Sequence, residues 1–271
     1  MQIQGIYKSD KEKSIFYTWN QAMHTRIDVV LCDRSEIKSK QIAARIYEEI
    51  NRIEKTGNRF DPESEISMIN QTASKQPVIL SADLFEIISL CMEYHKQTNG
   101  LFDITIQSEN YNKNTISSVI LNPGKGTIYF QEEGIKIDLC GFLKGYALEK
   151  IRPILQEERI EDALINFGNS SVMAIGNHPF GKGWKIKTST LSEKEDSVTL
   201  FNECFTTSGN SVTGRQHIIN PETGEYIEGI RTVSVITEKA TEGEAFSTAS
   251  FIATPEQQKE LIENKLHITF R

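Results

Sequence analysis

The chain has 271 residues, of which 38% are hydrophobic, and its formal net charge is −7. This length predicts one large unit or two intertwined halves, and the hydrophobic share predicts a folded protein instead of a disordered one. The negative charge argues against nucleic acid as the main partner, because the chain has no basic surplus with which to neutralise a phosphate backbone.

Cysteine spacing and hydropathy argue against a zinc protein, a disulfide-rich protein and a membrane-spanning protein. Cys32, Cys91, Cys140 and Cys204 show no CxxC spacing and no Cys/His cluster, so we expect neither a zinc site nor a disulfide framework. No stretch approaches the roughly 18 apolar residues of a membrane span, and the start of the chain contains no signal pattern. The chain as written is therefore expected to be soluble and cytoplasmic, or exported or membrane-anchored if a leader has been removed.

The sequence of the first third of the chain predicts two strands and two helices there. Strands are expected at Ile15–Asn20 and Arg26–Cys32, which are rich in β-branched and aromatic residues. A helix over Ile37–Lys55 follows, because isoleucines recur there at helical spacing. A second helix should run from Ser81 to about Gln97, with a serine at its start and a glycine beyond its end.

The rest of the chain alternates irregularly between strands and helices. A strand over Gly134–Leu139 leads into a helix from Gly141, which Pro153 should kink or restart because proline removes a helix donor. The other expected elements are a hairpin of Ala163–Phe167 and Val172–Ile175 around Gly168–Asn169, strands at Trp184–Lys187, Val198–Phe205, His217–Ile219, Thr232–Thr237 and His267–Phe270, and helices at Glu242–Ala253 and Pro255–Asn264. Without regular βαβ alternation, the pattern favours the α+β class.

A junction of strand and helix carries the first candidate for chemistry. The segment Asp138–Tyr146 supplies an acid, a glycine and a lysine within about one helical turn. Helix N-terminal amides and the Lys144 charge attract anions, and Gly141 lets the backbone approach closely, so the junction suits a phosphate. Taken alone, the same spacing is more often a turn glycine and a solvated lysine.

A helix near the C-terminus carries a candidate cation site. Glu244 and Thr248 are four residues apart, so on a helix they share a face and offer a carboxylate and a hydroxyl oxygen. Magnesium prefers oxygen ligands of this kind. The alternative is a solvent-facing glutamate beside a threonine that packs between helices.

Two loops add aromatic and titratable side chains. Phe60 and Phe102 stand beside carboxylates in expected loops, where functional residues concentrate, although either ring can also cap the core. His217 precedes a Pro-Glu-Thr-Gly turn that can hold a short extended segment against a ligand. A lone histidine is more often structural.

Together these motifs resemble those of the FAD:protein FMN transferases, the ApbE-like family, and in the family's order. The matching segments are Met23–Thr25, Phe60–Asn70, Thr98–Asp103, Asp138–Tyr146, Thr207–Gly209, His217–Gly224 and Glu244–Thr248. The resemblance spans nearly the whole chain and implies a single domain over residues 1–271, an α+β fold of two intertwined, related halves with FAD between them, and magnesium at the pyrophosphate.

The resemblance also implies roles for individual residues. The flavin or adenine pockets would be lined by Met23, Phe60, Leu101, Phe102 and Asp103, and FAD would also contact Asp138, Lys144, His217 and Ile218. Magnesium would bind the backbone carbonyl of Gly141 and the side chains of Glu244 and Thr248.

The implied reaction is attack by a threonine or serine hydroxyl of a partner protein on the FMN phosphorus of FAD, with release of AMP. Magnesium and Lys144 would neutralise the pyrophosphate, and His217 and Asp138 are the candidate bases. The implied partners are membrane redox subunits or secreted flavoproteins.

Several positions depart from the family's pattern. Glu244 stands where an aspartate is usual, and Gly168-Asn169-Ser170-Ser171 stands where a Gly-Gly-Asp-type turn is expected. Other differences are larger residues at Cys140, Phe142 and Leu143, and a short segment between Asp103 and Asp138 without the customary Pro-Leu and tryptophan. These departures keep two alternatives open: an FAD pyrophosphatase that forms FMN and AMP, and a non-catalytic FAD-binding protein.

Overall fold

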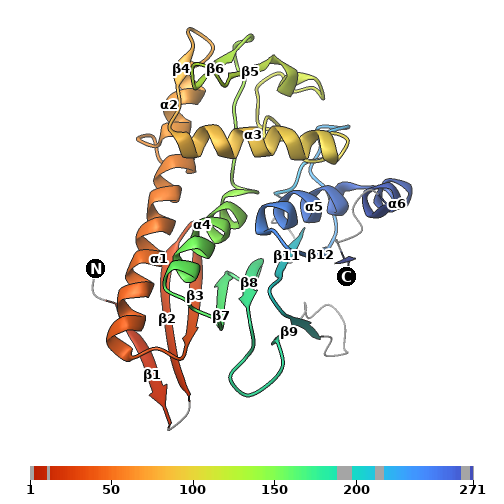
Figure 1. Cartoon of the computed structure of the whole chain (residues 1–271). Helices are drawn as coiled ribbons and strands as arrows, with labels where there is room; N and C mark the ends of the chain where they lie inside the picture. The colour runs from red at the N-terminus through yellow and green to blue at the C-terminus, as the bar shows by residue number, and fades with distance from the viewer. Residues whose placement is uncertain (1–2, 11–12, 188–196, 211–216, 264–268, 271) are drawn as a thin grey trace.

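An eight-stranded antiparallel sheet forms the centre of the molecule (Figure 1). The computed structural model describes residues 3–10, 13–187, 197–210, 217–263 and 269–270. In spatial order the strands are β1 (Gly5–Ser9), β2 (Ser14–Ala22), β3 (Thr25–Cys32), β7 (Ala163–Phe167), β8 (Ser171–Ile175), β11 (Cys204–Asn210), β12 (Arg231–Thr237) and β13 (Thr269–Phe270). Strands from both ends of the sequence thus share one sheet, and the α+β prediction is confirmed.

Helices cover one face of this sheet. The helices that pack on it are α1 (Glu36–Gly57), α4 (Leu143–Glu157) and α5 (Ala240–Ile252), and α3 (Ala82–Gln97) runs across them (Figure 1). Two shorter helices are α2 (Glu65–Thr72) and α6 (Pro255–Glu263). The large hydrophobic core lies between these helices and the inward-facing residues of the strands.

The strand alternation places a second, smaller core on the other face. Met173 belongs to the large core, whereas its neighbours Val172 and Ala174 pack with Trp184 and Phe205. The hairpin of β9 (Trp184–Lys187) and β10 (Ser197–Leu200) covers this part of the outer face. A separate three-stranded sheet contains β4 (Val78–Ile79), β6 (Thr127–Phe130) and β5 (Val119–Asn122), which follows the 3-10 helix η1 (Thr115–Ser118).

Serines begin the helices of the N-terminal half, as the Ser81 prediction requires. The side chains of Ser35, Ser64 and Ser81 each accept a hydrogen bond from the backbone three residues on. Helix α5 differs from these surface helices, because every one of its residues except Thr248 is buried. A helix that is apolar on all sides belongs in a core, so the acidic side chains on α5 require a specific reason for their burial.

Two tight turns lie at the same end of the sheet. Met23 and His24 connect β2 to β3 with positive φ angles of 50° and 56°. Gly168 opens the turn between β7 and β8 with a φ of 59°, and a Cβ atom there would lie 1.9 Å from the Thr25 hydroxyl oxygen. Glycine therefore suits this position, where a side chain would displace Thr25, and the expected hairpin around Gly168–Asn169 is confirmed.

The strand expected at Gly134–Leu139 is wrong. Among the described residues the segment pairs with no strand, because its backbone is hydrogen-bonded elsewhere. The Asn70 amide accepts from Ile137 N–H at 2.8 Å and donates to the Ile137 carbonyl at 2.9 Å. Asp138 N–H donates to the Ile104 carbonyl at 2.8 Å. A side chain thus supplies the bonds that a neighbouring strand would have supplied.

Other boundaries need smaller corrections. The strand expected at Val198–Phe205 is divided into β10 and β11, because Asn202 adopts a positive φ of 56° between them. His217–Ile219 contributes only an isolated bridge from Ile219 to Tyr226. Helix α4 continues through Pro153 to Glu157, since burial of apolar side chains on both sides of the proline outweighs one lost hydrogen bond.

The remaining C-terminal expectations lie partly outside the described residues, namely Asn264 and residues 267–268. Among the described residues, no helix is long and apolar enough to cross a membrane.

Candidate active site

The loop before α4 is shaped by Asp138. One carboxylate oxygen of Asp138 accepts a hydrogen bond from Cys140 N–H at 2.9 Å, and the other lies 3.0 Å from Arg59 Nε. The first bond closes an Asx turn, and the second is an ion pair in which the Asp138 side chain is only 14% exposed. With both oxygens engaged, Asp138 holds the loop in place and turns the backbone of Gly141 toward solvent.

Arg59 also supports an exposed aromatic ring. Its guanidinium lies 4.3 Å from the centroid of the Phe60 ring, and the His24 ring meets the edge of Phe60 at 5.7 Å. Phe60 itself is 59% exposed, and Met23 precedes His24 in the tight turn. The structure thus brings three of the expected positions, Met23, Phe60 and Asp138, to one place around Arg59.

Lys144 lies in the first turn of α4 and points toward the β7–β8 turn. Its ammonium donates a hydrogen bond to the Ser170 hydroxyl. In the part of the chain that the structure describes, no carboxylate oxygen lies within 4.0 Å of this ammonium. Lys144 therefore keeps a positive charge that is held by a neutral group at the N-terminus of a helix, where anions are favoured.

Glu244 is buried beside this lysine. It is 4% exposed, and its carboxylate accepts hydrogen bonds from the Ser171 hydroxyl at 2.5 Å and from Gly145 N–H. Burial raises the pKa of Glu244, although the nearby Lys144 charge and the two donors oppose this rise. A buried carboxylate that lacks an ion-pair partner among the described residues is a group that a cation would stabilise.

Thr248 marks the point where α5 reaches the surface of the site. Its hydroxyl lies 3.2 Å from the Ser208 hydroxyl, which also lies 2.8 Å from the Ser247 hydroxyl. Glu244 and Thr248 share the same helix face. They fit a hard cation in donor type, since carboxylate and hydroxyl oxygens are its preferred ligands. No group of three histidine, cysteine, aspartate or glutamate side chains suited to a metal occurs among the described residues, so a cation at Glu244 would also need hydroxyl or carbonyl oxygens.

Leu101, Phe102 and Asp103 lie beneath the loop. Leu101 and Phe102 are each 4% exposed, and the Phe102 ring is 6.0 Å from that of Phe142. Asp103 accepts from Thr105 N–H at 2.7 Å, from the Thr105 hydroxyl at 2.6 Å and from the Tyr111 hydroxyl at 3.1 Å. Asp103 is thus fully satisfied within the protein, and this segment supports the Asp138 loop from below.

Ile218 and His217 approach from the C-terminal half. Ile218 is 7% exposed, and its carbonyl accepts from Ile227 N–H at 2.9 Å. The Ile227 carbonyl in turn accepts from the Asn210 amide at 2.7 Å, which ties Ile218 to the end of β11. His217 is exposed at this end of the sheet.

Comparison with known proteins decides the family. The sequence model of the ApbE family matches residues 23–270, which is most of the chain. The chain belongs to the ApbE family. A relative from Chlamydia muridarum named FAD:protein FMN transferase is 26% identical over an alignment of 283 positions, which covers 92% of this chain and 87% of that protein.

Solved structures share the fold of this ApbE family member. The flavinyl transferase ApbE of Pseudomonas stutzeri, in its apo form, aligns with a TM-score of 0.83 and 16% identity over 97% of this chain and 92% of the other. The ApbE protein of Thermotoga maritima aligns with a TM-score of 0.81 and 23% identity over 94% and 93% of the two chains. At these identities the likeness establishes the fold alone.

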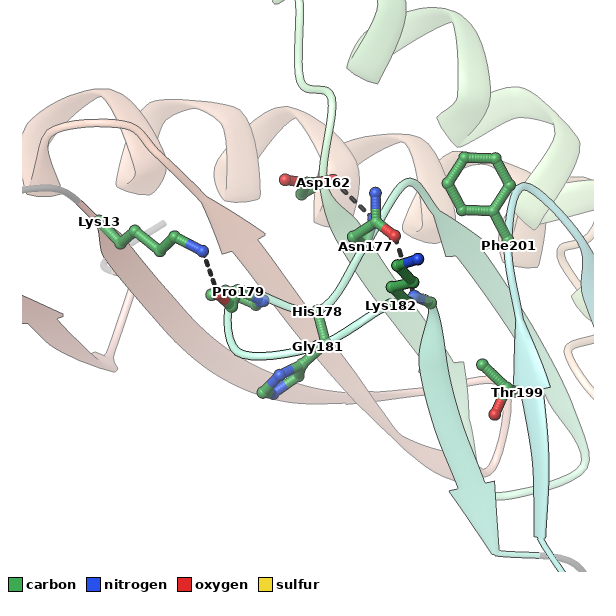
Figure 2. Close-up of a pocket in the computed structure, with 10 residues that line it drawn as sticks. Lys13, Asp162, Asn177, His178, Pro179, Gly181, Lys182, Thr199 and Phe201 are labelled. Atoms are coloured by element: carbon green, nitrogen blue, oxygen red, sulfur yellow. Dashed lines mark hydrogen bonds between the residues drawn. The ribbon is translucent and has the colours of Figure 1, made fainter.

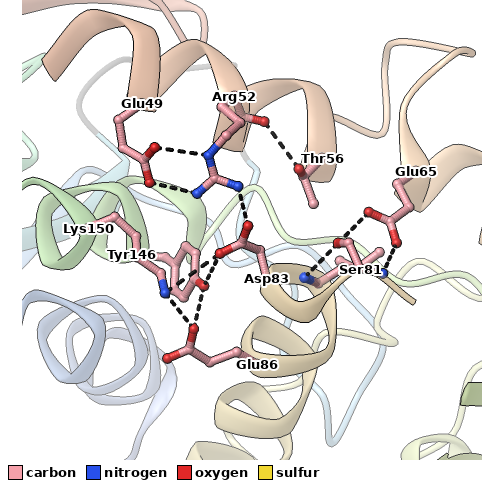
Figure 3. A network of polar contacts seen from close by, with 10 residues as sticks. Glu49, Arg52, Thr56, Glu65, Ser81, Asp83, Glu86, Tyr146 and Lys150 are labelled. Atoms are coloured by element: carbon pink, nitrogen blue, oxygen red, sulfur yellow. Dashed lines mark hydrogen bonds and ion pairs between the residues drawn. The ribbon is translucent and has the colours of Figure 1, made fainter. Parts of the chain in front are cut away.

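A polar network anchors α4 in this ApbE family member (Figure 3). Tyr146 is a buried residue that is 1% exposed. Its hydroxyl lies 2.7 Å from the Glu86 carboxylate and 3.1 Å from the Asp83 carboxylate. Arg52 on α1 pairs with Asp83, and Lys150 pairs with Glu86 at 2.6 Å. Because Tyr146 follows Lys144 by two residues, this network fixes the start of α4 against α1 and α3.

One cavity in the described part of the chain adjoins the site, and another lies apart from it. A cavity of about 350 Å³ is lined by Arg59, Asn70, Gln107 and their neighbours, next to Phe60 and Asp138. A cavity of about 680 Å³ lies elsewhere, where Asp162 accepts from Asn177 N–H at 2.6 Å and Lys13 bonds to the Pro179 carbonyl (Figure 2). None of the expected site residues lines the second cavity.

Arg59, Ser170, Ser171 and Ser208 contact the expected site residues, although the sequence did not predict them as parts of the site. Arg59 directly precedes Phe60, so a cation next to an exposed ring in a loop was the available signal. The serines carry no such signal, because their importance depends on which strands meet α4 and α5.

Proposed function

We propose that this ApbE family member transfers FMN from FAD to a threonine or serine hydroxyl of a target flavoprotein and releases AMP. The proposal rests on two groups of opposite charge that lie side by side at the start of α4. Lys144 presents a cation that no described carboxylate neutralises, and Glu244 presents a buried carboxylate next to it. A pyrophosphate with a bound divalent cation would satisfy both groups. The names of the curated relatives support the same reaction.

In this proposal FAD binds at the end of the sheet, between the two halves of the chain. Its phosphates lie at the N-terminus of α4 near Lys144, and a planar ring lies against Phe60, beside the cavity that Arg59 lines. Met23 and Ile218 bound this region from the β2–β3 turn and from the C-terminal half. Leu101, Phe102 and Asp103 support the site from the core more than they line it.

Magnesium would be held by Glu244, Thr248 and the Gly141 carbonyl, and would supply charge neutralisation to the pyrophosphate. The oxygen-only set of donors supports this assignment. Gly141 is exposed, and its backbone is turned outward by the Asp138 loop. Lys144 adds a second positive charge on the same phosphates, which stabilises the charge that develops as the leaving AMP departs.

The acceptor hydroxyl oxygen forms a bond to the FMN phosphorus, and the bond from that phosphorus to the AMP phosphate oxygen breaks. The hydroxyl proton passes to a base. His217 is the better candidate, because an exposed imidazole suits a general base by chemical type and Asp138 already holds the loop through Arg59 and Cys140. Asp138 acts as a positioning residue in this scheme.

Measuring AMP release from FAD tests this proposal, with magnesium or EDTA and with an acceptor domain that carries a threonine. Lys144→Met and His217→Asn should each reduce AMP release by about 100-fold, as loss of charge stabilisation or of a general base does. Release of AMP and free FMN without acceptor modification would indicate a pyrophosphatase. FAD binding without AMP would indicate a flavin-binding protein that lacks transfer.

A further inference from the structure

We propose that Ser170 and Ser171 are positioning residues that keep Lys144 and Glu244 from forming an ion pair with each other. Ser170 holds the ammonium and Ser171 holds the carboxylate, so that two adjacent residues at the β7–β8 turn separate two opposite charges. This inference deepens the proposed function, because it explains how one site keeps a free cation for phosphate and a free carboxylate for a metal ion.

The contact of Ser170 leaves the lysine charged. The Ser170 hydroxyl donates to the Phe167 carbonyl at 3.2 Å, so its remaining lone pairs accept from the Lys144 ammonium. A hydroxyl holds an ammonium in one direction without neutralising its charge. A carboxylate at the same position would pair with Lys144 and weaken its attraction for phosphate.

The contact of Ser171 holds the carboxylate from the other side. Its hydroxyl donates to Glu244 at 2.5 Å, and Ser171 and Glu244 are 0% and 4% exposed. Gly145 N–H donates to the same carboxylate. A short hydrogen bond to an ionised acceptor is among the stronger contacts in a protein interior, so the carboxylate has a fixed orientation.

Keeping the charges of Lys144 and Glu244 apart costs free energy. Opposite charges attract strongly where water is excluded, and Lys144 is near enough for its charge to act on Glu244. Yet among the described residues the two groups are not within the 4.0 Å of an ion pair. Without the serines, the long lysine and glutamate side chains would be free to pair, and each would then be less available to a ligand.

Ser171→Ala tests the inference most sharply, because Ser171 touches Glu244 and not Lys144. FAD affinity is measured by flavin fluorescence in EDTA, so that no metal contributes. Loss of the Ser171 hydroxyl should let Glu244 capture Lys144 and should weaken FAD binding by about tenfold, as losing one charged contact does. Adding Glu244→Gln should restore the affinity, because a neutral amide does not compete for the ammonium. Ser171→Thr should retain it.

Ser250→Ala is the matched control. Ser250 is a buried serine on the same helix as Glu244, and its hydroxyl has no hydrogen-bond partner among the described residues. Its replacement should leave FAD affinity unchanged. If Ser171→Ala leaves the affinity unchanged, or if Glu244→Gln does not restore it, Ser171 has a packing role only and the inference is wrong.

A crystal structure of the Ser171→Ala protein separates this inference from the proposed function, since it needs no FAD. The inference predicts that Lys144 Nζ moves to within about 4 Å of the Glu244 carboxylate, the distance of an ion pair. Unchanged positions of both side chains would overturn the inference even if the wild-type protein transfers FMN. A wild-type protein that does not bind FAD would contradict the proposed function. The prediction that Lys144 approaches Glu244 in Ser171→Ala would still be tested by the crystal structure.

Discussion

Gly145 on α4 meets Glu244 on α5 more closely than any other residue type would allow. Its N–H donates to the Glu244 carboxylate, and a Cβ atom at position 145 would lie 2.6 Å from Glu244 Cγ and 2.6 Å from the Ala240 carbonyl oxygen. This contact joins the proposed phosphate-binding end of α4 to the candidate metal-binding face of α5. The spacing of the two helices therefore sets the distance between the two halves of the site.

Gly145→Ala should test this dependence. The added methyl group overlaps a backbone carbonyl that cannot move away alone, so we expect a loss of about 1–3 kcal/mol in the free energy of unfolding. Urea unfolding measures this loss. Gly141→Ala is the control for stability, because a Cβ atom there has no neighbour within 4 Å. Equal stability of the two variants would show that α5 moves freely away from α4.

Arg59→Ala should weaken FAD binding without unfolding the protein. Arg59 links the Asp138 loop to the Phe60 ring, so its loss frees both from a common support. We expect the FAD dissociation constant to rise about tenfold and the unfolding temperature to change little, because Arg59 and Phe60 lie near the surface. Arg59→Lys keeps the charge but not the planar stacking, so its FAD affinity should lie between that of the wild type and that of Arg59→Ala. Unchanged affinity in Arg59→Ala would remove Phe60 from the proposed ring site.

Acid should destabilise the protein partly through Asp83. The hydrogen bond from Arg52 lowers the pKa of Asp83, with the Tyr146 hydroxyl and Lys150 acting in the same direction and partial burial opposing them. A lowered folded-state pKa stabilises the protein above the unfolded-state pKa of about 3.9, and this stabilisation is lost as the pH falls through the folded-state value.

Asp83→Asn measures this contribution in urea unfolding between pH 3 and pH 7. The variant should be less stable than the wild type near neutral pH, and the difference should shrink as the pH falls below about 4. Because the ion pairs around Asp83 are partly exposed, the difference should be modest and should decrease in high salt. A difference that grows toward acid would contradict the assigned direction.

Much of the fold follows from local sequence patterns, and the site follows less completely. Isoleucine spacing predicts α1, and a high content of β-branched and aromatic residues predicts β2 and β3. The false strand at Gly134–Leu139 shows the limit of this reasoning. Its composition suits a strand, but Asn70, more than 60 residues earlier, takes the backbone bonds instead.

The site depends still more on contacts between distant segments. The spacing of Glu244 and Thr248 predicts a shared helix face, and the structure has both on α5. Nothing local predicts that Ser171 binds Glu244 or that Arg59 binds Asp138, because these contacts depend on the order of strands in the sheet. The burial of Leu101, Phe102 and Asp103 illustrates the same point, since it also depends on contacts between distant segments, and their expected roles toward FAD stay predictions.

Mass analysis of an acceptor protein is the decisive test of FMN transfer by this chain. The purified chain is incubated with FAD, magnesium and an acceptor domain that carries a threonine, and AMP is measured in the same samples. A transferase adds the mass of FMN less one water to that hydroxyl and releases one AMP per modified acceptor, and Lys144→Met should reduce both by about 100-fold. Binding of FAD with neither AMP nor a modified acceptor would contradict the account.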